Sequence, residues 1–166
     1  MPLQDELDFL NPVADLAHET IMSIVLTGEM LAKEADRILK PLKLTQAQFN
    51  VLMLLRFQSE KGEVNQTRLG RMLLVNRSNV TGLVDRMERD GWVMRVAEPG
   101  DRRVKKVRMT EVGRKLCDKA AKAYFERVHE LVSSHSAQAQ KDLCRRLDEI
   151  RSHIHEKAAH SLEPEA

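Results

Sequence analysis

The sequence predicts a mainly α-helical protein with one small β-hairpin. Charged residues make up 31% of its 166 residues and aromatic residues only 4%. This composition suits amphipathic helices better than a β-sandwich. Apolar residues recur at helical spacing over most of the chain, and the period changes only between residues 92 and 109. The length suits one domain, which we expect over residues 1–160, with residues 161–166 as a disordered tail.

The first long helix is expected over residues 11–40. Asn11 can serve as the N-cap, and Pro12 suits the first helical position because the N–H that it lacks has no helical partner there. Pro41 would end this helix. Apolar side chains recur along it at intervals of three and four, which predicts one buried stripe.

Two shorter helices follow. Thr45 and Gln48 have the spacing of a capping box, and they precede an apolar run that ends near Gln58. A polar connection then leads to Asn65, which is a suitable cap for a helix from Gln66 to Leu73.

The next helix is expected to run from Arg77 to Asp90, with Asn76 as its cap and Gly91 directly after its end. Its apolar residues follow helical spacing and are Val80, Leu83, Val84 and Met87. Only residues 74–76 separate this helix from the preceding one, so the pair predicts a helix-turn-helix. In that motif the N-terminal residues of the second helix enter the major groove of DNA.

A β-hairpin should follow, with strands at Trp92–Ala97 and Val104–Met109. The connection between them contains Pro and Gly, which predict a turn, and we expect Arg102 and Arg103 to lie in it. A hairpin directly after a recognition helix is the wing of a winged helix, so residues 45–110 are expected to form a winged helix-turn-helix region.

The remaining chain predicts two long helices, about 111–133 after the cap Thr110 and about 137–159 after the cap Ser136. The last helix carries a narrow apolar seam of Leu143, Leu147, Ile150 and Ile154. Together with the first helix, these segments offer more apolar surface than a small winged helix can cover. We therefore expect residues 11–40 and 111–160 to be dimerisation helices of a homodimer.

Positive charge is concentrated in one stretch. The formal net charge is +2, yet residues 65–108 contain eleven Lys or Arg against five Asp or Glu, while the remainder is net negative. Such asymmetry favours a polyanionic partner, with a solvated basic face as the alternative.

Several other classes of protein are disfavoured. No nucleophile, base and orienting group stand at a motif spacing, no phosphate-binding glycine loop occurs, and no cofactor or metal site is indicated, so we expect no enzyme. His153 and His155, which with His160 could suggest a metal site, are two residues apart and do not share a helix face, so metal sensing is a minor alternative. No stretch is long and apolar enough for a membrane span, and the acidic N-terminus is unlike a secretion signal, which predicts a soluble cytoplasmic protein.

The segment from Asp101 to Gly113, DRRVKKVRMTEVG, resembles the wing signature DxRxxxVxLTxxG of the MarR family of transcriptional regulators. Met109 replaces the usual Leu and conserves its volume and apolar character. LTQAQFNVLMLL is similar to the second helix of that family, and NQTRLGRMLLVNRSNVTGLVDRMERDGWV is similar to its helix-turn-helix. Gly82 stands where a larger polar residue is common.

The resemblance implies a homodimer that binds a pseudo-palindromic operator on double-stranded DNA, acts by default as a repressor and is released by a small molecule. The residues expected at the DNA are Arg68, Arg71, Arg77, Ser78, Asn79, Thr81, Arg102 and Arg103. Arg77, Ser78, Asn79 and Thr81 begin the recognition helix and would read bases, although Ser78 and Thr81 have phosphate contact or helix capping as the alternative.

The other basic residues have different expected roles. Arg68 and Arg71 would hold phosphates, and either Arg102 or Arg103 would enter the minor groove. The family pattern implies that Asp101 pairs with Arg103 to shape the wing. Loose surface charge is the alternative for both wing arginines.

The effector expected from the resemblance is a small molecule, often an aromatic or phenolic anion, held between the dimerisation helices and the winged region. Candidate ligands by residue type and position are His18, Arg37, Tyr124 and His129, each with an ordinary surface or core role as the alternative.

Two alternatives concern the function itself. Cys117 and Cys144 lie in predicted dimerisation helices, where reduced thiols, packed or partly exposed, are favoured over a redox sensor. A winged helix can also serve as a protein-interaction adaptor without specific DNA binding, in which case binding to DNA would depend weakly on salt.

Overall fold

The computed structural model describes residues 3–8, 13–59, 62–73, 77–98 and 101–160. It divides into two parts, Met1–Tyr124 and Phe125–Ala166. The expectations placed on Asn11, Pro12, residues 74–76 and the tail lie outside the described residues, and the single domain over residues 1–160 stays a prediction.

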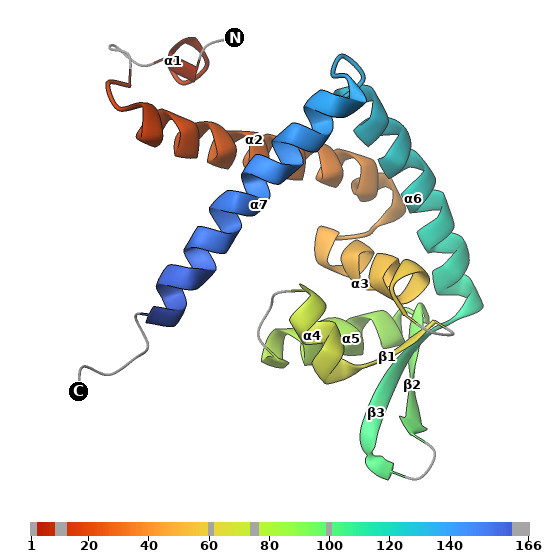
Figure 1. Cartoon of the computed structure of the whole chain (residues 1–166). Helices are drawn as coiled ribbons and strands as arrows, with labels where there is room; N and C mark the ends of the chain where they lie inside the picture. The colour runs from red at the N-terminus through yellow and green to blue at the C-terminus, as the bar shows by residue number, and fades with distance from the viewer. Residues whose placement is uncertain (1–2, 9–12, 60–61, 74–76, 99–100, 161–166) are drawn as a thin grey trace, which may run out of the picture. The chain divides into compact units, whose positions relative to one another are not determined.

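The first part contains most of the helices and all of the described strands (Figure 1). Its elements are α1 (Leu3–Glu6), α2 (Leu16–Leu39), η1 (Lys40–Leu42), α3 (Gln46–Phe57), β1 (Glu63–Asn65), α4 (Gln66–Leu73), α5 (Arg77–Arg89), β2 (Val93–Glu98), β3 (Asp101–Met109) and the start of α6 (Glu111–Leu131). The second part contains the end of α6 and α7 (Ala137–His160). The predicted fold class, mainly helical with a β wing, is confirmed.

Side-chain caps place the helix starts. Thr45 and Gln48 form the predicted capping box: the Gln48 N–H donates to Thr45 Oγ1 at 3.2 Å, and the Thr45 N–H donates to Gln48 Oε1 at 2.9 Å. Asn65 Oδ1 accepts from the Arg68 N–H at 2.6 Å and caps α4 as expected.

The prediction for the start of the first helix was wrong by several residues. α2 begins at Leu16, and its N-cap is Asp15, whose carboxylate accepts from the His18 N–H at 2.6 Å. Asp is as good an N-cap as Asn, so the composition of this stretch permits two starts. At its other end the helix stops at Leu39, and Pro41 lies within the short 3₁₀ turn η1.

The strands form a three-stranded antiparallel sheet in the order β1-β3-β2. β1 was missed by the sequence analysis, because its three residues, Glu63–Asn65, become a strand only by pairing with Lys106–Arg108 of β3. The wing prediction is also corrected in one detail: β3 starts at Asp101, so Arg102 and Arg103 lie in the strand and not in the turn.

The core of the first part lies between α3, α4, α5 and the sheet. Its largest fully buried side chains include Leu52, Leu55, Leu69, Val84 and Met87. Because α5 contributes Val80, Leu83, Val84 and Met87 to this cluster, the opposite face of that helix is left to solvent.

The second part has a different character. None of its described side chains is buried. Ser136 Oγ accepts from the Ala139 N–H at 3.2 Å and caps α7 as predicted. No helix in the described ranges is long and apolar enough to cross a bilayer.

A tight backbone junction joins α5, β2 and α6. Gly91 has a φ of +74° and ends α5, with the Trp92 N–H donating to the Met87 carbonyl at 2.9 Å. The carbonyl of Trp92 in turn accepts from the Thr110 N–H at 3.0 Å, and Thr110 Oγ1 donates to the carbonyl of Gly91 at 2.7 Å. The start of α6 is thereby fixed to the end of α5.

Gly113 is required by this junction. A Cβ atom at Gly113 would lie 2.0 Å from the Trp92 carbonyl oxygen, well inside any real contact. The Gly113 N–H also donates to Thr110 Oγ1 at 3.0 Å, so the threonine is the cap of α6. The sequence TEVG is therefore explained by one cap and one close approach.

We predict that Gly113→Ala lowers the free energy of unfolding by about 1–3 kcal/mol, because the methyl group would force backbone atoms apart. Gly82→Ala is the matched control. A Cβ atom at Gly82 would lie 3.6 Å from Arg86 Nη1, so this change should stabilise α5 by about 1 kcal/mol. Denaturant unfolding followed by circular dichroism measures the free energy of unfolding of both variants. Equal changes in that free energy for the two variants would contradict the prediction.

Candidate DNA-binding interface

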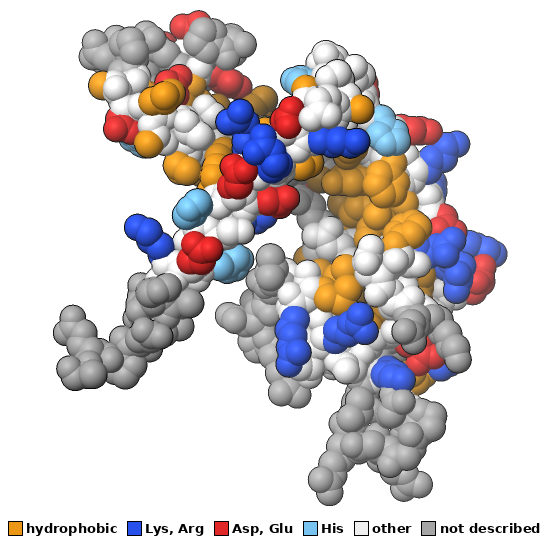
Figure 2. All heavy atoms as spheres, viewed as in Figure 1, with side chains coloured by type: hydrophobic (Ala, Val, Ile, Leu, Met, Phe, Trp, Pro, Cys, Tyr) orange, Lys and Arg blue, Asp and Glu red, His pale blue; other side chains and the backbone are white. Residues whose placement is uncertain are grey.

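The helix-turn-helix is formed by α4 and α5. Arg68 and Arg71 are both exposed and lie three residues apart on α4, so they share one face of that helix. Figure 2 shows Lys and Arg side chains on the surface formed by α4 and α5. The fixed positive charges there suit contact with phosphate groups.

The predicted base-reading residues lie at the N-terminus of α5. The backbone of Arg77, Ser78 and Asn79 forms the first turn of the helix, and their side chains lie outside the described part of the structure. Thr81 follows one turn after Arg77 and is exposed. Its position stays compatible with the role assigned to it from the sequence.

Thr81 is linked to the preceding helix. Its Oγ1 accepts a hydrogen bond of 2.7 Å from Gln66 Nε2, so the two helices of the motif are joined across their exposed side. This bond restrains the hydroxyl and leaves the methyl group as the part of Thr81 suited to contact a thymine methyl.

Arg95 of β2 attaches the wing to the recognition helix. Its guanidinium forms ion pairs with Glu88 and with Asp85 of α5, the latter at 2.5 Å. The Arg95 N–H also donates to Glu88 Oε1 at 2.8 Å, which occupies part of the free edge of β2. Burial opposes the charged form of Arg95, but its hydrogen bonds to Asp85 and Glu88 outweigh this effect and raise its pKa.

A second ion pair joins β3, the central strand, to the edge strand β1. Arg108 Nη2 of β3 lies 2.8 Å from Glu63 Oε1 of β1, and these residues are direct partners in the sheet register. Arg95 and Arg108 were counted in the basic stretch, yet both are engaged within the protein. The exposed cations that remain on the described helices of this region are Arg68, Arg71, Arg86 and Arg89.

The wing departs from regular pairing near its tip. Ala97 lies opposite Lys105, whereas the next residue, Glu98, lies opposite Asp101. Arg102, Arg103 and Val104 therefore form a bulge on β3, and a bulge bends and twists its strand. The side chains of Asp101, Arg102 and Arg103 lie outside the described part, so their expected pairing and groove contact stay predictions.

The predicted effector residues do not gather at one place in the first part. His18 and Arg37 lie nineteen positions apart on α2, roughly 28 Å along a helix axis, which is too far for one small ligand to contact both in the same chain. The Tyr124 ring packs against Phe49 with their centroids 5.2 Å apart. His129 belongs to the second part.

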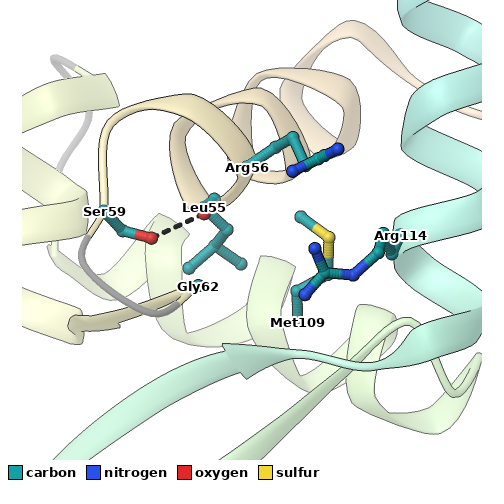
Figure 3. Close-up of a pocket in the computed structure, with 6 residues that line it drawn as sticks. All are labelled: Leu55, Arg56, Ser59, Gly62, Met109 and Arg114. Atoms are coloured by element: carbon teal, nitrogen blue, oxygen red, sulfur yellow. Dashed lines mark hydrogen bonds between the residues drawn. The ribbon is translucent and has the colours of Figure 1, made fainter.

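Among the cavities lined by described residues of the first part, two bear on the predicted sites. One, of about 290 Å³, lies between α3, β1, β3 and α6 and is lined by Leu55, Arg56, Ser59, Gly62, Met109 and Arg114 (Figure 3). The other, of about 560 Å³, lies at the end of α2 and is lined by Lys33, Asp36, Arg37, Lys40, Lys43, Leu44 and Thr45. Of the predicted effector residues, only Arg37 lines either of these two cavities.

Sequence reasoning missed Arg56, Arg95 and Arg114. Arg56 of α3 forms an ion pair of 2.9 Å with Asp118 of α6, which raises the pKa of Arg56 through the hydrogen bond and the charge of Asp118. Arg56 and Arg114 are far apart in the sequence, and only the folded chain brings them to the lining of one cavity. For Arg95, the only signal was a charged residue within an otherwise apolar strand.

The two cysteines differ in environment. Cys117 is fully buried, and desolvation raises the pKa of its thiol to about 11. Cys144 is exposed, so of the two expected environments, packed or partly exposed, Cys117 has the first and Cys144 does not. Among the described residues, no three His, Cys, Asp or Glu side chains are grouped to hold a metal ion.

Comparison with known proteins gives the family. The MarR family model matches residues 44–105, from the residue before the α3 cap into β3. The chain is 35% identical over 118 residues to the transcriptional activatory protein BadR of Rhodopseudomonas palustris, covering 69% of this chain and 67% of BadR. It is 30% identical over 125 residues to the multiple antibiotic resistance protein MarR of Escherichia coli, covering 73% and 84%.

Solved structures agree in fold. CouR from Rhodococcus jostii RHA1, bound to p-coumaroyl-CoA, has a TM-score of 0.73 and 27% identity over 83% of this chain and 95% of that chain. Sco3205 from Streptomyces coelicolor, in complex with DNA, has a TM-score of 0.70 and 23% identity over 93% and 94%, a likeness of fold.

The helix-turn-helix, its basic exposed face and the attached wing define a DNA-binding regulator of transcription and not an enzyme. The chain belongs to the MarR family.

We predict that replacing Arg95 loosens the wing. Arg95→Met should lower the free energy of unfolding by about 1 kcal/mol, since its carboxylate partners are partly exposed, and should speed hydrogen exchange in β2. Arg95→Lys keeps the positive charge but loses the several N–H donors of the guanidinium. Its free energy of unfolding and its exchange rate in β2 should therefore lie between those of the wild type and of Arg95→Met. Unchanged exchange in β2 for both variants would argue against this attachment.

Thiol labelling should separate the two cysteines. A disulfide reagent at about pH 8 should modify Cys144 in the folded protein and Cys117 only after unfolding, because burial both blocks access and raises the Cys117 pKa to about 11. Cys144→Ser should leave no reactive thiol in the folded chain, and Cys117→Ala should leave one. The unfolded chain ionises Cys117 near its ordinary pKa of 9.0, so stability linked to this thiol is present below that pH and lost as the pH rises to about 11.

Proposed function

We propose that the chain acts in the cytoplasm as a homodimeric repressor that binds a pseudo-palindromic operator and is released by a small molecule. The observation that carries this proposal is the exposed basic face of α4 and α5, next to a wing whose second strand, β3, has Arg102 and Arg103 near its start. A symmetric dimer would present this face twice, to half-sites roughly 10 base pairs apart.

The dimer is supported by apolar surface on the helices expected to form it. On α2, the exposed large apolar side chains are Leu16, Ile21, Val25, Met30 and Leu31. In the second part they are Phe125, Leu131, Leu143 and Ile154. A second copy of the chain is the partner that would cover such stripes in a symmetric assembly.

The proposed DNA contacts divide into two kinds. Arg77, Ser78, Asn79 and Thr81 would read bases, with Arg suited to guanine and Asn to adenine. Arg68 and Arg71 would contact phosphates and fix the position of the helix without reading sequence. Arg102 or Arg103 would enter the minor groove beside the half-site.

Release by a ligand is supported by CouR, which was crystallised with p-coumaroyl-CoA. We propose a small molecule of the aromatic-anion class as the effector of this chain. For the direction of regulation, repression is the proposal, and activation, which the name of BadR indicates for that relative, is the competing outcome.

Mobility shifts with the DNA upstream of the protein's own gene, repeated at several salt concentrations, test the proposal. The logarithm of affinity should fall linearly with the logarithm of salt concentration, by about 0.9 for each phosphate neutralised. Arg68→Ala should reduce that slope by about 0.9 on every duplex, whereas Asn79→Ala should cost about 1–3 kcal/mol on the operator alone. Lys119→Ala, at an exposed position on α6, is the control and should change neither the salt slope nor the operator affinity.

Three results would contradict the proposal. An affinity for DNA that does not change with salt concentration would favour the protein-interaction adaptor. A sedimentation mass near 19.0 kDa, that of one chain, would contradict the homodimer. Unchanged operator affinity after replacing both Arg102 and Arg103 by Ala would remove the wing from the interface.

A further inference from the structure

Gly82 lies in the middle of α5, at a position where the fold itself does not require a glycine. Its φ is not positive, and a Cβ atom added there would lie 3.6 Å from Arg86 Nη1, which is an ordinary van der Waals contact. Inside a helix, glycine is less favourable than alanine because its backbone loses more freedom on folding. The presence of Gly82 therefore needs an explanation outside the core.

Gly82 belongs to the face of α5 that points away from the core. The core side of this helix carries Val80, Leu83, Val84 and Met87. Positions 79, 82 and 86 follow one another at intervals of three and four, so they lie together on another face. Because position 79 is expected to read a base, the bare backbone of Gly82 lies on the side of α5 expected to face the major groove.

The side chain of Arg86 runs back along the helix and covers Gly82. Its Nη1 atom lies 3.6 Å from the place of a Cβ atom at residue 82, one helical turn before the residue that carries it. Long side chains on a helix lean toward its N-terminus in this way. A longer side chain at residue 82 would compete for the same space, so glycine leaves that space to the guanidinium of Arg86.

Arg86 is available to an external partner. It is exposed, and the two carboxylates nearest to it along α5, Asp85 and Glu88, pair with Arg95 of β2. No carboxylate among the described side chains forms an ion pair with Arg86 itself. Arg89, the other exposed arginine of this helix, has Asp85 and not a glycine one turn before it, so it carries the same charge without the same space.

We propose that Arg86 reads a base pair of the operator, and that Gly82 is the positioning residue that lets its guanidinium reach the major groove. A guanidinium can donate two parallel hydrogen bonds to O6 and N7 of guanine, so the base is a guanine. It should neighbour the base pair read by Asn79, which shares this face of the helix. The inference rests on the proposed function, since it requires an operator, and it adds a reader to the residues named there.

Selection of duplexes from a random-sequence library by the full-length wild-type protein supplies the probe. Mobility shifts then compare the selected duplex, a scrambled duplex, and duplexes in which one G·C pair of a half-site is replaced by A·T. The wild type should lose about tenfold in affinity or more at one such guanine. Arg86→Gln should bind the selected duplex about tenfold more weakly and should no longer distinguish guanine at that position, with an unchanged melting temperature because the side chain is exposed.

Arg89→Gln is the matched control, since it removes one exposed positive charge from the same helix. It should keep the full preference of the wild type for that guanine. If Arg89→Gln lost this preference as well, the effect would belong to the charge of the helix, and the assignment to Arg86 would be overturned.

Two variants test the role of Gly82. Gly82→Ala adds only the Cβ atom at 3.6 Å and should keep the preference for guanine. Gly82→Leu fills the space and should lose that preference, while its affinity for the scrambled duplex stays within about twofold, because phosphate contacts carry that affinity. A Gly82→Leu variant that keeps the preference, or that loses affinity for both duplexes equally, would overturn the role of Gly82.

The outcomes separate this inference from the proposed function. If the wild type enriches a sequence and Arg86→Gln keeps every base preference, or loses affinity equally on the selected and scrambled duplexes as a phosphate contact would, the inference is overturned and the proposed function stands. If the wild type enriches no sequence, the proposed function fails and this inference fails with it.

Discussion

The carbonyl group of Trp92 is the point on which the arrangement of the DNA-binding region depends. It accepts the Thr110 N–H, and it lies where any side chain at residue 113 would have to go. Because Trp92 directly follows the C-terminal turn of α5, the recognition helix, the first wing strand and the start of α6 meet at one peptide group. A rigid connection of this kind lets a displacement in one of the three elements reach the other two.

Ion pairs also fix the position of the wing. Arg95 and Arg108 belong to the most basic stretch of the chain, but both form ion pairs within the protein. Arg95 holds β2 to α5, and Arg108 holds β3 to β1. The number of Lys and Arg residues in this stretch therefore overstates how many cations are available to DNA. Among the side chains that the structure describes in this region, the other exposed arginines lie on α4 and α5, whose orientation is set by their buried faces.

Residues that act through contacts with near neighbours in the sequence predicted the fold well. Contacts between residues far apart in the sequence could not be predicted. Thr45 with Gln48, Asn65 and Gly91 mark element boundaries through contacts within a few residues, so they are readable in one dimension. β1 is a strand only because β3 lies beside it, and the two arginines of the smaller cavity come from separate helices. The effector residues suggested by type and position illustrate the limit, since His18 and Arg37 share a helix but not a ligand-sized space.

The bulge on β3 has a consequence for how such a protein can change over time. Three residues, 102–104, lie between the pair Ala97 with Lys105 and the pair Glu98 with Asp101, so the ladder from Lys105 to Met109 is complete without them. Insertions or deletions in this stretch would alter the reach of the hairpin while the sheet beneath it kept its register. In the complex proposed above, the contact of the wing with flanking DNA would therefore vary with the length of this stretch, independently of α5.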